Sequence, residues 1–251
     1  MNKSSVTMLD APERSHILAG GLYAVLCFFS LPFLLLLLTS GLDQDPKIAS
    51  WFEIAFHVLN SIVVGSLFRE YLADALLNAQ IYKEKVITGV AIAVGLMLGV
   101  GLLWHFLGLF TGVEMLLIAG FGTVPLSEMD LFMLSADMVL YNKVFGTLCM
   151  VLLVPVTTSC LYYAIGFVPF YNIRPWLGYL VLACALAFPR VCNATTYWDP
   201  LPELILYLAQ LPVHMIGAWV YKKTDSIWAP IASIAITNLI STVLLMIFYR
   251  V

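Results

Sequence analysis

The sequence predicts an all-α, polytopic transmembrane helical bundle, and two observations support this fold class. Hydrophobic residues make up 62% of the 251 positions, charged residues only 11%, and the mean hydropathy is +0.96. A soluble domain carries about 25% charged residues, so this composition is typical of an integral membrane protein. The apolar residues also gather in long runs, separated by short polar breaks such as Asp43–Pro46 and Tyr82–Lys85.

Seven of these runs are candidate spans, because a membrane-spanning helix needs about 20 mostly apolar residues. They cover roughly residues 17–39, 51–77, 86–110, 140–168, 175–190, 202–221 and 227–249. The segment Gly112–Met138 is harder to assign, since its apolar core Val113–Ile118 is too short to span and acidic residues interrupt it. We expect this segment to lie at the interface or to re-enter the bilayer, with an eighth span as the alternative.

The distribution of basic residues predicts a cytoplasmic N-terminus, because cytoplasmic loops carry an excess of Lys and Arg. With the N-terminus inside, the four outer residues are Lys47, Lys143, Arg190 and Arg250, and the eight inner ones are Lys3, Arg14, Arg69, Lys83, Lys85, Arg174, Lys222 and Lys223. We therefore expect an N-terminal cytoplasmic segment at 1–16 and a single transmembrane helical domain at 17–251. The expected location is the plasma membrane of a bacterium, with the lipid bilayer as one partner.

Charge and cysteine content exclude several classes of partner and cofactor. The net charge of −3 and the absence of long basic runs argue against a nucleic-acid partner. The five cysteines lie in apolar stretches and none forms a C-x-x-C pair, so we expect buried packing residues and neither a disulfide framework nor a zinc site. The sequence predicts no cofactor and no metal.

One polar group falls inside an expected span. Glu53, His57 and Asn60 lie at i, i+4 and i+7, which places them on one face of a helix. Ionisable residues inside a membrane are costly and often functional, so these three could form a proton relay, a metal site or an acid–base pair. The structural interpretation, which we favour, places Glu53 at the membrane boundary and has His57 and Asn60 hydrogen-bonded to neighbouring helices.

The C-terminal part of the chain contains a more specific pattern. Gly217 precedes the basic turn Lys222–Ser226, and the turn is followed by Trp228–Ile231 and, further on, by Asn238. This arrangement resembles the last motif of the CPBP family, also called Abi, which comprises CAAX proteases and bacteriocin-processing intramembrane proteins. That motif continues with His-x-x-x-Asn, and in this chain Ile234 occupies the histidine position.

Two further motifs of the family have counterparts upstream. The Phe-x-x-x-His motif matches Phe188, with Cys192 in place of the histidine. In the Glu-Glu-x-x-x-Arg motif, Thr158 and Ser159 occupy the glutamate positions and Tyr163 the arginine position. The resemblance covers residues from about 151 to 242.

The resemblance implies an intramembrane protease in which a glutamate activates water while the histidines and the asparagine orient it or stabilise the oxyanion. Thr158 and Ser159 cannot act as general bases near neutral pH, and Ile234 has no hydrogen-bonding group. We therefore expect a catalytically inactive member of this family. Its expected role is to bind another membrane protein or a membrane-associated peptide, as a scaffold, regulator or immunity-like factor.

Two other functions remain open from the sequence. A protease with a different site would use Cys192 or Ser159 as nucleophile beside a histidine such as His214, because a nucleophile needs an adjacent base or a lowered pKa. A small-molecule transporter or channel would show inverted repeats and charged residues near the bilayer midplane. Prolines do interrupt the spans, but we find no repeat and little intramembrane charge.

Overall fold

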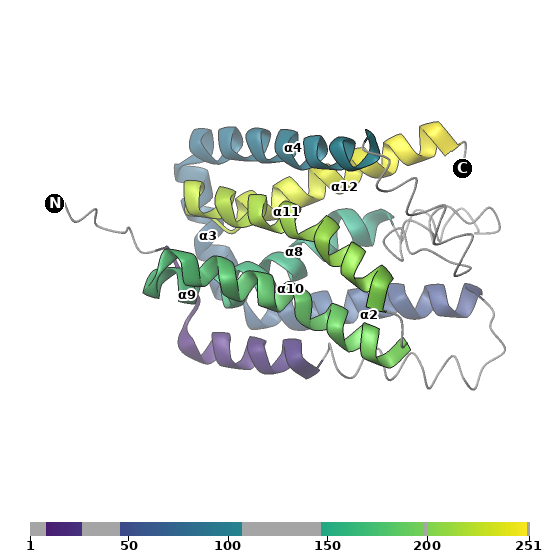
Figure 1. Cartoon of the computed structure of the whole chain (residues 1–251). Helices are drawn as coiled ribbons and strands as arrows, with labels where there is room; N and C mark the ends of the chain where they lie inside the picture. Colours follow the sequence, from purple (N-terminus) through teal and green to yellow (C-terminus); the bar gives the residue numbers. More distant parts are fainter. Residues whose placement is uncertain (1–8, 27–45, 107–146, 198–199, 250–251) are drawn as a thin grey trace.

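The computed structural model describes residues 9–26, 46–106, 147–197 and 200–249, and within them every regular element is helical. The first helical segment covers residues 14–26. It is followed by α2 (Pro46–Leu67), α3 (Arg69–Ile81), α4 (Lys83–Phe106), η1 (Cys149–Leu153), α8 (Val154–Thr158), η2 (Ser159–Phe167), α9 (Val168–Ile173), α10 (Pro175–Tyr197), α11 (Pro200–Thr224) and α12 (Trp228–Tyr249). The long helices run lengthwise beside one another in one bundle (Figure 1).

Among the described residues, three helical stretches are long and apolar enough to cross a membrane: Lys83–Leu103, Val151–Ile173 and Glu203–Thr224. Shorter apolar helices cover His57–Leu67, Pro175–Val191 and Trp228–Val243. This all-helical architecture agrees with the predicted fold class and is compatible with a membrane location. The expected number of about seven spans is not confirmed by these helices, and the segment Gly112–Met138 lies outside the described residues.

The second expected span, 51–77, is divided in the structure. Helix α2 ends at Leu67, and α3 begins at Arg69 after a bend at the fully buried Phe68. The backbone hydrogen bonds continue through the bend, since the Phe68 N–H donates to Val64 O at 2.9 Å and the Leu72 N–H donates to Phe68 O at 2.8 Å. The sequence predicted a single span here because α3 contains enough apolar residues to extend the apolar run of α2.

The stretch from Cys149 to Ile173 alternates between α- and π-helical turns. Its two π-helical parts are η1 and the nine-residue η2, which lies between Pro155 and Pro169. A proline has no N–H to donate within a helix, and local π adjustments help such helices to satisfy their backbone. π-Helical turns are rare, and the single-turn bulges that occur inside α-helices are frequently found at functional sites.

Helix η2 lies at the centre of the main hydrophobic core. Tyr163 and Phe167 of η2 are fully buried, together with Phe68 and with Tyr221 of α11. Helices α10 and α11 pack against each other and both contact η2, while α4 and α12 pack side by side (Figure 1). The residues around η2 therefore determine which polar groups meet inside the bundle.

Helix α10 is longer than the sequence suggested. The expected span covered residues 175–190 and placed Arg190 on the outer side, but α10 continues through Pro189 to Tyr197. A proline within a helix is tolerated in membrane proteins when neighbouring groups satisfy the freed carbonyl. As a consequence, Arg190 lies on a helix facing α11 rather than in a loop.

Candidate functional site: a polar cluster between η2, α10 and α11

One face of α11 carries a row of polar side chains. Glu203, Gln210 and His214 lie at i, i+7 and i+11, and this spacing places them along one stripe of the helix. Because α11 packs against α10 and contacts η2, the stripe meets side chains from both elements. Polar groups inside an apolar bundle are costly unless they are paired, so their partners identify the candidate site.

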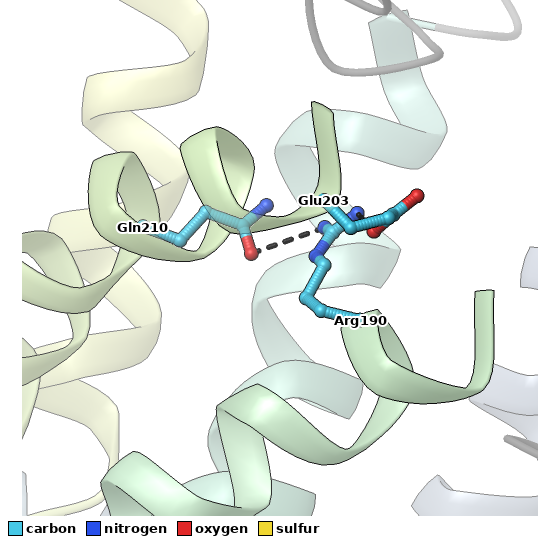
Figure 2. A network of polar contacts seen from close by, with 3 residues as sticks. All are labelled: Arg190, Glu203 and Gln210. Atoms are coloured by element: carbon cyan, nitrogen blue, oxygen red, sulfur yellow. Dashed lines mark hydrogen bonds and ion pairs between the residues drawn. The ribbon is translucent and has the colours of Figure 1, made fainter. Parts of the chain in front are cut away.

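The charged end of this stripe is an ion pair between α10 and α11. Figure 2 shows the guanidinium group of Arg190 between the side chains of Glu203 and Gln210. Arg190 Nη1 lies 3.2 Å from Glu203 Oε2, and Arg190 Nη2 donates to Gln210 Oε1 at 3.1 Å. The two charged side chains are 22% and 13% exposed, so solvent screens the pair only partly. Arg190 Nε is buried and has no hydrogen-bond partner among the described residues.

The buried end of the stripe is a tyrosine–histidine pair. Tyr163 Oη of η2 and His214 Nδ1 of α11 lie 3.1 Å apart. A neutral imidazole has one donor and one acceptor nitrogen, so either tautomer forms this hydrogen bond. A methyl group at Gly217 would lie 2.5 Å from Tyr163 Cζ, and the absence of a side chain there is what allows the phenol ring to lie against α11.

The two ends belong to one electrostatic group. The ring centroids of Tyr162 and His214 are 5.1 Å apart in an edge-to-face arrangement. The charge of Arg190 acts on both Tyr162 and His214. We call the set Tyr162, Tyr163, Arg190, Glu203, Gln210 and His214 the α11 polar cluster.

The positions matched to the protease motifs are only partly brought to this cluster. Tyr163 belongs to it, whereas Ile234 is 8% exposed and lies in the hydrophobic core. Ser159 is fully buried, and its hydroxyl has no hydrogen-bond partner among the described residues. Thr158, Phe188 and Asn238 are half-buried. Cys192 lies on α10, and its side chain is outside the described part of the structure.

The polar face expected on the second span makes a different connection. The Asn60 Oδ1 atom accepts a hydrogen bond of 2.9 Å from the Tyr23 hydroxyl, which ties α2 to the helical segment 14–26. His57 is half-buried, and its carbonyl accepts a bond of 2.8 Å from Ser61. The side chain of Glu53 lies outside the described residues. The contact made by Asn60 is the interhelical bond that the structural interpretation predicted.

The sequence reasoning did not recognise the ion pair of the α11 polar cluster. Arg190 was assigned to the outer side at the end of a span, and Glu203 and Gln210 were not considered as partners. The signal that would have found them is the recurrence of polar residues at Glu203, Gln210 and His214, which follow helical spacing within an otherwise apolar run.

A second polar group fixes the N-terminal residues to the bundle. Asn172 binds the Leu9 backbone twice, at 2.8 Å to the N–H and at 2.9 Å to the carbonyl. Tyr221 donates to Asp10 O at 2.8 Å, so its oxygen accepts the bond shared with the Tyr71 hydroxyl.

Electrostatics oppose the charged form of one member of this group. Burial and the nearby Asp225 raise the pKa of Asp10 above its usual value of 3.8. The Asp225 carboxylate accepts a hydrogen bond of 3.2 Å from the Asp10 N–H. Docking of the N-terminal residues is therefore sensitive to the ionisation of this carboxyl group.

Most polar groups of the α11 polar cluster are paired with one another. His214 is hydrogen-bonded to a phenol, and the arginine is paired with a carboxylate, while Arg190 Nε has no hydrogen-bond partner among the described residues. Within residues 9–26, 46–106, 147–197 and 200–249, no group of three or more His, Cys, Asp or Glu side chains is placed to hold a metal ion.

Comparison of this chain with protein-family models, with curated proteins and with solved structures finds no match.

Proposed function

We propose that the chain is a membrane-embedded binding protein built on a degenerate CPBP-like scaffold and lacking the peptidase activity of that family. In this proposal it holds another membrane protein or a membrane-associated peptide, as a scaffold or regulator. The N-terminus faces the cytoplasm. The proposal is supported by the sequence resemblance and by the burial of Tyr163 and Ile234, which stand at motif positions of that resemblance.

The observation that carries the proposal is the packing of Tyr163. This residue stands at the position of the family's arginine, is fully buried, and is hydrogen-bonded to His214 while its ring lies against Gly217. A buried phenol in contact with a glycine backbone leaves no space for a substrate carbonyl or an attacking water at that point. Ile234, at the position of a catalytic histidine, packs in the hydrophobic core.

The alternative protease site receives less support from the same geometry. A serine nucleophile needs a base within about 3 Å of its hydroxyl. The hydroxyl of Ser159 has no hydrogen-bond partner among the described residues, and His214 Nδ1 is engaged by Tyr163. The α11 polar cluster would suit a transporter better than a protease, because it places charged and polar groups inside the bundle.

The proposal is tested with the purified full chain reconstituted in liposomes. Two probes are used: a fluorogenic transmembrane peptide and a lipidated peptide ending in a CAAX sequence. We expect saturable binding of at least one probe without cleavage, and no change in the cleavage background in Ser159→Ala or His214→Gln. Gly95→Ala serves as the control variant, because a methyl group at this position of α4 meets nothing within 4 Å.

Two results would overturn the proposal. Cleavage that disappears in Ser159→Ala or His214→Gln, and persists in Gly95→Ala, would identify an active protease. Failure of both probes to bind, together with probe-independent solute flux that His214→Gln abolishes, would favour the transporter.

A further inference from the structure

Three exposed basic residues lie where α9, α10 and α11 meet at one end of the bundle. Arg174 follows α9 directly, and Lys222 and Lys223 lie in the last turn of α11. None of the three forms an ion pair with another described residue. This end of the bundle also contains the beginnings of α4, α10 and α12 (Figure 1).

Aromatic rings hold the two lysines in place. Lys222 Nζ lies 5.7 Å from the centroid of the Tyr171 ring, and Lys223 Nζ lies 5.0 Å from the Trp219 ring. Such cation–π contacts orient an ammonium group without neutralising its charge. The lysine charges thus remain available to a further anionic group.

A pair of tyrosines links Arg174 to Lys222. The ring centroids of Tyr171 of α9 and Tyr179 of α10 are 6.3 Å apart. Lys222 contacts the Tyr171 ring, and its charge also lies near Tyr179. Arg174 follows Tyr171 by three residues, about one helical turn. Arg174 and Lys222 therefore both lie near the end of α9, where Lys222 contacts Tyr171 and Arg174 follows it by about one turn.

The surroundings of this corner match a membrane interface. Trp176, in the first turn of α10, is 58% exposed, and tryptophans are enriched where a membrane meets water. The N-terminal end of α10 begins beside Arg174 and carries a partial positive charge, which adds to the attraction for an anion. The nearest acidic residue in sequence, Asp225, has its carboxylate directed to the Asp10 N–H.

We propose that the corner formed by Arg174, Lys222 and Trp176 binds the headgroup of an anionic phospholipid. The phosphate lies between the guanidinium and ammonium groups, and the Trp176 ring lies at the level of the headgroups. Basic pockets between transmembrane helices on the cytoplasmic side bind acidic headgroups in this way. This inference rests on the membrane location within the proposed function, and it goes beyond that function by naming a lipid ligand.

The test measures lipid binding to the purified full chain in a neutral detergent, by native mass spectrometry. Phosphatidylglycerol and phosphatidylcholine are titrated in parallel, with inorganic phosphate as a separate competitor. We expect preferential binding of phosphatidylglycerol. In the double variant Arg174→Gln/Lys222→Gln its affinity should fall about 100-fold, since each hydrogen bond from a charged donor to the phosphate contributes about tenfold.

The matched control is Lys83→Gln/Lys85→Gln, which removes two exposed lysines at the same end of the bundle. It should leave the affinity for phosphatidylglycerol within about twofold. An equal loss in the control, equal binding of the two lipids, or displacement by inorganic phosphate at the same concentration as by lipid would overturn the inference. A chain that fractionates away from membranes would instead overturn the proposed membrane function.

Discussion

The contact between Tyr163 and Gly217 gives a prediction that can be followed through to a measurement. In Gly217→Ala the added methyl group would overlap the Tyr163 hydroxyl and lie 2.5 Å from Tyr163 Cζ. Under about 3.0 Å something must move, and the phenol ring is enclosed on all sides because Tyr163 is fully buried. We expect the ring to shift away from α11 and its hydrogen bond to His214 to break.

The magnitude follows from these two effects. Overpacking a core costs about 1–3 kcal/mol, and leaving a buried hydrogen-bonding group without its partner costs about 1–3 kcal/mol. Replacing a helical glycine by alanine returns about 1 kcal/mol. The net destabilisation is about 3 kcal/mol, which corresponds to a Tm about 6–12 °C lower for a chain of this size. Thermal unfolding of the protein in detergent measures this shift directly.

Two matched variants decide whether the reasoning is right. Gly95→Ala and Gly99→Ala on α4 add the same methyl group where nothing lies within 4 Å, so their Tm should be unchanged or slightly higher. In a Tyr163→Leu background the ring is absent, and Gly217→Ala should then cost at least 1 kcal/mol less, by about the coupling seen between contacting residues. If Gly217→Ala is as harmless as Gly95→Ala, Tyr163 does not pack against α11 as described.

Three further predictions concern polar contacts. Tyr163→Phe should lower the free energy of unfolding by about 1–3 kcal/mol, because His214 Nδ1 stays buried without its partner; urea unfolding measures this, and an unchanged midpoint would contradict it. Glu203→Gln should lower the free energy of unfolding by about 1–3 kcal/mol, because it leaves the Arg190 charge unpaired. The double variant Arg190→Met/Glu203→Leu should regain most of this stability, because replacing a buried ion pair by apolar residues is often neutral or stabilising. Because the pKa of Asp10 is raised in the folded chain, docking of the N-terminal residues should be strongest below pH 3.8 and weaken as pH rises through the raised pKa. Hydrogen exchange at the Asp10 amide measures this docking, and its pH dependence should disappear in Asp10→Asn. An identical pH profile in that variant would exclude Asp10 as the source of the dependence.

Several parts of the fold could be predicted because their cause is local. The apolar runs around residues 86–110, 202–221 and 227–249 correspond to α4, α11 and α12, since the length and composition of a segment are enough to indicate a membrane-length helix. The boundary between α2 and α3 could not be predicted in this way. Phe68 precedes the charged pair Arg69 and Glu70, but its complete burial depends on helices distant in the sequence.

The candidate site was predicted only in part, for a related reason. Tyr163 was selected because it stands at a motif position, but its partner His214 was considered as a possible base beside Cys192 or Ser159. The two are 51 positions apart in sequence, and only the packing of η2 against α11 brings them together. Arg190 was misplaced because the span was expected to end at residue 190, whereas α10 continues to Tyr197.

The sequence by itself determined that this chain is all-helical and strongly apolar, because hydrophobic periodicity and length are properties of each segment alone. It also determined which residues lack the chemistry of the protease motifs, because the functional groups of Thr158, Ser159 and Ile234 do not depend on the fold. Only the tertiary structure decided which polar groups meet. A buried polar side chain must find a partner, and in an apolar bundle the available partners are set by which helices pack together.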